Sequence, residues 1–222
     1  MNGYFIFLIL FFIVILIEMY GEFKDNNDLI IAFKPLAMPI LVLFYIFAAN
    51  FENIDWFIII ALLCGGAGDF FLMLKNEDKW FLYGMIAFLL NQIFFIVSFL
   101  LSIEDITAFN PWGLFLLGPV SLIMLFTVPK FIKKTGDLKV PVLVYMIAIL
   151  VMHISALLRL AQFTGLAFIF IYMGSIFFIF SDSYLALNKW DGESKQKRMI
   201  NISTYFLAQF YIALGAVFTS LI

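Results

Sequence analysis

The chain has 222 residues, of which 65% are hydrophobic and only 13% are charged, and its formal net charge is -2 at pH 7. An apolar share this high excludes an ordinary soluble domain and indicates an integral membrane protein. The near-neutral charge balance gives no reason to expect a nucleic-acid partner, and membrane lipids are the expected surroundings.

Eight stretches are apolar and long enough to cross a bilayer, because a membrane-spanning helix needs about 20 residues. In chain order they are Tyr4–Tyr20, Leu29–Ala49, Ile54–Leu74, Trp80–Leu101, Pro111–Val128, Val140–Leu160, Phe163–Leu187 and Ile200–Leu221. The first is taken as a span, since no Lys or Arg precedes it and no cleavage site follows it. The connections are too short to form a soluble domain, so we expect a single all-α bundle of eight transmembrane helices over residues 1–222.

Basic residues gather in alternate connections between these spans. Eleven of the 13 Lys and Arg residues follow the first, third, fifth and seventh spans: Lys24, Lys75, Lys79, Lys130, Lys133, Lys134, Lys139, Lys189, Lys195, Lys197 and Arg198. The positive-inside rule therefore predicts that these connections face the cytoplasm and that both termini face away from it. Because the chain has no targeting signal and its loops are short, we expect it in a bacterial inner membrane.

Four polar side chains are expected at one depth in the cytoplasmic half of the membrane. Asp69, Lys34 and Asp182 lie about 9–10 Å from the cytoplasmic ends of their spans at the rise of an α-helix. Tyr205 lies at a similar depth in the last span. A carboxylate in lipid costs at least ~2.5 kcal/mol, so such groups usually face the bundle interior or a water-filled cavity. The pattern predicts a pocket that opens toward the cytoplasm.

Amide side chains are expected slightly deeper, where Asn91, Gln92 and Gln209 would line the floor of this pocket. The small residues of "ALLCGGAG", just before Asp69, are expected to let a neighbouring helix approach closely and to leave space beside the carboxylate. Glu18 is expected to mark the cytoplasmic end of the first span.

The remaining polar residues of the spans have ordinary structural interpretations. His153 is expected to be a hydrogen-bonded histidine within the bundle, and Arg159 an anchor at the opposite membrane interface. With one His and one Cys, Cys64, the chain is not expected to hold zinc, and no cofactor is predicted. The carboxylates leave a hard cation open as an alternative.

A weak internal repeat links the two halves of the chain. "GDFFLML" at Gly68 and "SDSYLAL" at Ser181 share a small residue, an aspartate and two leucines at matching positions, and "FLLNQIFFI" aligns with "YFLAQFYIA" at Gln92 and Gln209. The similar offsets predict two four-helix halves, about 1–110 and 111–222.

Several of these segments together resemble the YhhN-like, lysoplasmalogenase family of integral membrane proteins. They are "FKP", "GDFFLML", "YGMIAFLL", "GSIFFIFSDSYLALNKW" and "YFLAQFYIA", in order from about Phe33 to Ala213. The resemblance implies an eight-helix hydrolase that cleaves the vinyl ether of lysoplasmalogens to a fatty aldehyde and a glycerophospho-head group, with Asp69 and Asp182 in the active site. Where members of the family often have a histidine, this chain has Asn91 and Gln92, so a role of that histidine does not carry over.

The predicted residues suit this chemistry. Vinyl ether hydration needs a protonated acid and a carboxylate, and two neighbouring buried aspartates supply both, because they cannot both ionise easily. Asp69 and Asp182 are therefore predicted jointly as the catalytic pair. Lys34 is predicted to bind the substrate phosphate, with competition for this pair as the alternative, and Tyr205 would hydrogen-bond the ether oxygen or water. The predicted partner is a single-chain lysophospholipid; a proton-coupled transporter and a lipid-binding protein are the alternatives.

Overall fold

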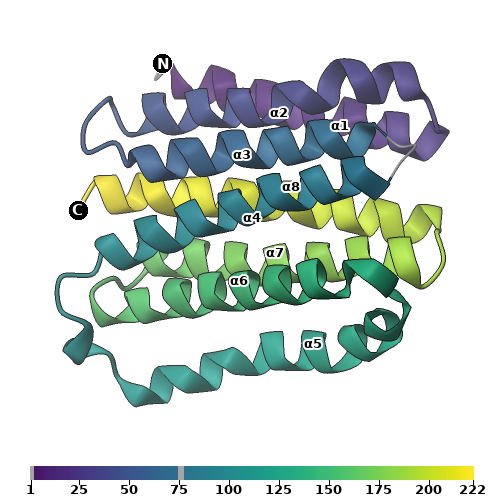
Figure 1. The fold of residues 1–222 in the computed structure, drawn as a ribbon. Coiled ribbons are helices and arrows are strands. Elements are labelled where there is room, and N and C mark those ends of the chain that lie inside the picture. Colours follow the sequence, from purple (N-terminus) through teal and green to yellow (C-terminus); the bar gives the residue numbers. More distant parts are fainter. Residues whose placement is uncertain (1–2, 75–77) are drawn as a thin grey trace. The chain divides into compact units, whose positions relative to one another are not determined.

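The structure is a computed structural model that describes residues 3–74 and 78–222. Its helices are α1 (Tyr4–Lys24), α2 (Asn27–Ala48), α3 (Trp56–Met73), α4 (Asp78–Leu101), α5 (Gly118–Phe131), α6 (Lys139–Leu158), α7 (Leu166–Trp190) and α8 (Lys195–Ser220) (Figure 1). Eight helical segments of the described chain are long and apolar enough to cross a membrane, and none of its residues lies in a β-strand. The predicted all-α, eight-span class is confirmed, and the orientation of the termini stays a prediction.

The chain divides into two compact units. The first comprises Met1–Ser98 with Ala213–Ile222, and the second comprises Phe99–Ile212. The single eight-helix domain and the internal repeat of four plus four helices both stay predictions.

In the first unit, α2 packs against both α1 and α3. The turn between α1 and α2 is closed by Asn26, whose side chain caps α2 by accepting hydrogen bonds from the backbone N–H groups of Asp28 and Leu29. Asp55 caps α3 in the same way through the Phe57 N–H group. Such caps satisfy backbone donors that a helix leaves open at its N-terminus.

Glycines in α3 allow the close approach of two neighbouring helices. A methyl group on Gly68 would lie 2.8 Å from the Phe88 ring of α4, and one on Gly66 would lie 3.0 Å from Met38 of α2. The close packing predicted from "ALLCGGAG" is therefore present. At Gly68, the space left by the missing side chain is occupied by the Phe88 ring, directly before Asp69 in the sequence.

In the second unit, α7 contacts both α5 and α6. The predicted fifth span, Pro111–Val128, begins with a 3₁₀-helix over Pro111–Leu117, and the α-helical part starts only at Gly118. Proline suits this start because it lacks the backbone N–H group that a first turn leaves unused, and Asn110 caps the segment by accepting from the Trp112 N–H group.

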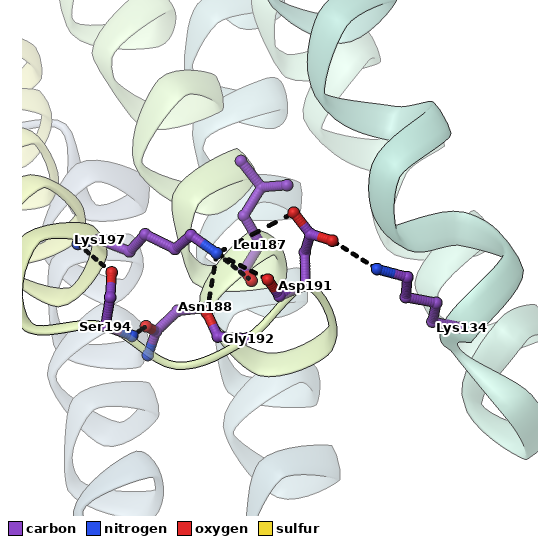
Figure 2. Close-up of polar contacts among 7 residues, drawn as sticks. All are labelled: Lys134, Leu187, Asn188, Asp191, Gly192, Ser194 and Lys197. Carbon is purple, nitrogen blue, oxygen red and sulfur yellow. Dashed lines mark hydrogen bonds and ion pairs between the residues drawn. The ribbon is translucent and has the colours of Figure 1, made fainter.

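The connection between α7 and α8 is held by Lys197 (Figure 2). Its ammonium group lies 2.7 Å from the carbonyl oxygen of Gly192, 2.9 Å from that of Asp191 and 3.4 Å from that of Leu187. A cation at a helix C-terminus both satisfies open carbonyl groups and interacts favourably with the helix dipole. The Asp191 carboxylate bonds to Lys134, which follows α5. This cluster ties the ends of α5, α7 and α8 together within the second unit.

The Asp191 contact makes part of the stability depend on pH. A hydrogen bond from Lys134 holds the pKa of the Asp191 carboxyl below its ordinary value of 3.8. A carboxyl whose pKa is lower in the folded state adds stability above the unfolded value and loses it as the pH falls through the folded value. We expect Asp191→Asn to lower the thermal unfolding midpoint slightly at pH 7, and the difference from wild type to shrink as the pH falls below the ordinary carboxyl pKa of 3.8. The exposed Asp137 provides a matched control, since Asp137→Asn should leave the unfolding midpoint unchanged at both pH 7 and low pH. If the midpoint of Asp191→Asn stayed below that of the wild type at low pH, the stabilising role of the Asp191 carboxylate would be contradicted.

Candidate functional site

A buried ion pair lies within the first unit. The Lys34 ammonium nitrogen of α2 lies 3.5 Å from Oε1 of Glu18 in α1, and the Glu18 side chain is fully buried while that of Lys34 is 11% exposed. Asp69 of α3 is also buried and interacts electrostatically with both partners. The structure therefore brings the predicted residues Lys34 and Asp69 into one cluster.

The helix arrangement explains why these groups meet. Glu18 and Glu22 are four residues apart, so they lie on the same face of α1, and both are buried. Asp69 lies about one turn before the end of α3. Because α2 packs against both α1 and α3, Lys34 can interact with the acids of both helices.

The expectation that Glu18 marks the end of the first span is wrong. Helix α1 continues to Lys24, and the fully buried Glu18 side chain is paired with Lys34. The Glu18 carboxylate can lie away from water because the opposite charge of Lys34 compensates it. Glu18 and Glu22 are the residues of this cluster that sequence reasoning missed. The sequence does contain a signal for them: the two glutamates are one helical turn apart, and the lysine predicted within the second span, Lys34, requires an anion to compensate its charge.

The amides of α4 are fully buried in the first unit, as predicted for the interior of the bundle. Asn91 donates a hydrogen bond of 2.6 Å from its Nδ2 to the carbonyl oxygen of Ala61 in α3. This bond fixes α4 to α3. The binding roles predicted for Asn91 and Gln92 stay predictions.

The second unit holds the other predicted aspartate. Asp182 of α7 accepts a hydrogen bond from the Tyr145 hydroxyl of α6. The neighbouring Ser181 donates to the Asn201 side chain of α8 over 2.7 Å. Asp182 is thus positioned at a junction of α6, α7 and α8, and Tyr145 is a further residue that sequence reasoning missed. Tyr145 lies in an apolar helix, and no spacing of polar residues around it predicts a contact with Asp182.

Three polar side chains lie along one face of α8 at intervals of about one turn: Asn201, Tyr205 and Gln209. The buried Tyr205 ring meets Phe178 of α7 edge-on, with ring centroids 6.1 Å apart. Gln209 is fully buried, and among the residues that the structure describes neither its amide oxygen nor its amide nitrogen has a hydrogen-bond partner. A buried amide without protein partners marks a place for water or a polar ligand group.

Asp69 and Asp182 each have well-defined surroundings within their own unit. Asp69 belongs to the Glu18–Lys34 cluster, and Asp182 to the contact with Tyr145. Their joint action on one substrate stays a prediction.

Two further polar residues of the second unit have structural roles. Nδ1 of His153 and the hydroxyl of Ser175 are 2.8 Å apart, as expected for a hydrogen-bonded histidine within the bundle. Arg159 was expected to be an interfacial anchor, but it is only 1% exposed, so this expectation is wrong. Its guanidinium carbon lies 4.2 Å from the centre of the Phe163 ring, and the group also donates to Ser102. The aromatic ring and the hydroxyl replace the water that an exposed cation would have.

Comparison with known proteins gives one match. The model of the YhhN family matches residues 29–216, which is most of the chain. Searches of curated proteins and of solved structures gave no match. The matched range contains Lys34, Asp69 and Asp182, whereas Glu18 and Glu22 lie before it.

Proposed function

The chain belongs to the YhhN family, and on this basis we propose that it is an intramembrane hydrolase that cleaves the vinyl ether bond of lysoplasmalogens. The observation that carries the proposal is the buried Asp69 carboxyl, which interacts electrostatically with the Glu18–Lys34 ion pair. A carboxyl in such a place is a suitable proton donor, because burial disfavours its ionised form while a nearby cation limits the cost of ionisation.

The reaction is a hydration. An acid transfers a proton to the vinyl carbon that is β to the ether oxygen, and positive charge develops on the adjacent carbon and oxygen as an oxocarbenium ion. Water then adds to that carbon and loses a proton to a carboxylate, which gives a hemiacetal. The hemiacetal breaks its carbon–oxygen bond to release a fatty aldehyde and the glycerol hydroxyl of the head group. One water is consumed and the catalytic proton is returned.

In this proposal Asp69 and Asp182 share the acid and base roles. The position of Lys34 supports its role as the cation that compensates the acids more than a role in phosphate binding, because Glu18 lies only 3.5 Å from its ammonium group. The polar side chains that would orient the substrate or its water are Tyr205, Asn91, Gln92 and Gln209. The buried amide of Gln209, with no protein partner among the described residues, supports such a role.

A single-chain lipid suits a site of this kind. Its tail would lie among the apolar side chains of the helices, and its polar head would stay at the membrane surface that the positive-inside rule assigns to the cytoplasm. A diacyl lipid would need a wider opening between helices. We therefore propose lysophospholipids with one alkenyl chain as the substrate class, and the cytoplasmic half of a bacterial inner membrane as the location of the site.

The test is aldehyde release by the purified protein from an alkenyl lysophospholipid, compared with the ester-linked lysophospholipid of the same head group. We expect aldehyde from the vinyl ether alone. Asp182→Asn should lower the rate strongly, because an amide can neither donate an acidic proton nor accept one as a base. Wild-type protein that releases no aldehyde from any alkenyl lysophospholipid would overturn the proposed function.

A proton-coupled transporter is the second candidate, because buried acids paired with a lysine also occur in ion relays. This function predicts proton-dependent solute movement in liposomes that contain the protein, without aldehyde formation. Measuring both activities on the same preparation separates the two functions.

A further inference from the structure

Two polar contacts join α6 to α7 in the second unit, one between Tyr145 and Asp182 and the other between His153 and Ser175. His153 follows Tyr145 by eight residues and Ser175 precedes Asp182 by seven, so at the rise of an α-helix the two contacts are about 10–12 Å apart along the helices. Halfway between them on α6 lies Ile149, which is apolar and buried. The His153 contact is therefore separate from the residues assigned to the proposed reaction.

The hydrogen bonds of Ser175 determine which ring nitrogen of His153 carries a proton. The Ser175 hydroxyl donates to the carbonyl oxygen of Tyr172 over 2.6 Å, and a serine hydroxyl has only one proton to donate. Nδ1 of His153, which lies 2.8 Å from the same hydroxyl oxygen, must therefore be the donor of the second bond. A ring protonated on both nitrogens would be a buried cation, and no acid pairs with it within residues 3–74 and 78–222. The imidazole is thus neutral, with its proton on Nδ1 and a lone pair on Nε2.

The Nε2 atom is a buried acceptor without a protein donor. His153 is fully buried, and its Nε2 has no hydrogen-bond partner in the part of the chain that the structure describes. The ring of Tyr172 is close, with its centre 5.5 Å from that of the imidazole, but the Tyr172 hydroxyl donates to the carbonyl oxygen of Leu116 instead. A buried acceptor that lacks a donor is unfavourable, so a donor group from outside the protein is expected at Nε2.

We propose that His153 binds a hydroxyl group, which donates a hydrogen bond to Nε2. A hydroxyl suits this place because it is a small donor without charge, whereas an ammonium group would bring an uncompensated cation into the apolar interior. Water and a lipid hydroxyl share this chemistry and are the two sources to be distinguished. The site does not depend on the proposed function, because none of its residues takes part in the proposed reaction.

The experiment is NMR of the full chain with ¹⁵N-labelled histidine. Because the chain has one histidine, each ring nitrogen gives a single assignable signal. The protein is measured in an amine-oxide detergent, which has no hydroxyl group, and in vesicles of phosphatidylglycerol, whose head group has two. We expect a protonated Nδ1 and an unprotonated Nε2 whose chemical shift is lower than that of a free lone pair, as for a nitrogen that accepts a hydrogen bond.

The two preparations identify the source of the hydroxyl. A hydrogen-bonded Nε2 in both supports water, and a hydrogen-bonded Nε2 in the vesicles alone supports a lipid hydroxyl. A proton on Nε2, or an Nε2 with the shift of a free lone pair in both preparations, would overturn the proposal. Neither measurement needs substrate, so the result is the same whether or not aldehyde is formed.

A pair of serine variants tests the assignment of the ring proton. Ser175→Ala removes the acceptor of the Nδ1 proton, so we expect a second set of signals from rings that carry the proton on Nε2. Ser155→Ala is the matched control, because Ser155 is also buried in α6 and donates to a carbonyl oxygen three residues earlier, that of Met152, at 2.7 Å. It should leave the signals of His153 unchanged. If Ser175→Ala gave the wild-type signals, Ser175 would not hold the proton on Nδ1 and the assignment of Nε2 as the acceptor would fail.

Discussion

Asp69→Asn is expected to lower the rate of aldehyde release from an alkenyl lysophospholipid about 10²- to 10⁴-fold, the usual range for loss of a general acid or base. Asparagine has nearly the same shape as aspartate, so the packing next to Gly68 and Phe88 should be preserved. It cannot exchange a proton, and it carries no charge toward Lys34. The measurement is kcat for the purified variant and the wild type in the same detergent or lipid.

The control for this variant is Asp137→Asn, which removes an exposed carboxyl from the connection between α5 and α6 and should leave kcat unchanged. Thermal unfolding of both variants shows whether each is folded. Full aldehyde release by folded Asp69→Asn would exclude Asp69 as the acid or the base of the reaction.

The fold was predictable because hydropathy is a local property of the sequence. A run of about 20 apolar residues is sufficient to predict a span, whatever its neighbours are. Eight helices of the described chain are long and apolar enough to span a membrane, as predicted, and the depth expected for Asp69 and Lys34 from the rise of an α-helix stays a prediction. Both residues do lie in one cluster, because α2 packs directly against α3.

The partners of the charged residues were not predictable in the same way. Glu18 resembled the end of a span because an unpaired carboxylate belongs at the surface, and only the packing of α1 against α2 supplies its cation. Arg159 resembled an interfacial anchor for the same reason. Its actual surroundings, Phe163 and Ser102, depend on how the segments around α6 pack. Charge alone predicts the cost of burial, whereas the compensating group comes from tertiary structure.

The site itself was predicted in part. The occurrence of ionisable residues within apolar spans is the reason for predicting Asp69, Asp182 and Lys34, since a charged side chain is costly to bury, and their roles stay predictions. Tyr145 was missed because a tyrosine in a membrane helix is common, and its contact with Asp182 depends on the packing of α6 against α7. Glu22 was not predicted because it lies beyond the expected end of the first span at Tyr20, whereas α1 extends to Lys24.

Gly174→Ala is expected to destabilise the second unit, because it acts on a close backbone approach of α8 to α7. A methyl group there would lie 2.9 Å from the carbonyl oxygen of Ala208 and 3.0 Å from the backbone nitrogen of Ile212. These are backbone atoms that no side-chain rotation can move, so the two helices must separate. Overpacking typically costs about 1–3 kcal/mol, and the better helix propensity of alanine offsets at most about 1 kcal/mol of that.

The measurement is the thermal unfolding midpoint in detergent, where each kcal/mol corresponds to about 2–4 °C for a chain of this size. Gly118→Ala is the matched control: Gly118 has helical backbone angles, and no atom outside its own stretch of helix backbone lies within 4 Å of the added methyl group. It should therefore leave the midpoint unchanged or raise it slightly. Because Tyr205 and Gln209 lie on the helix that Gly174 holds in place, separation of α7 and α8 should also reduce aldehyde release. A midpoint for Gly174→Ala equal to that of Gly118→Ala would show that the two helices do not need this contact.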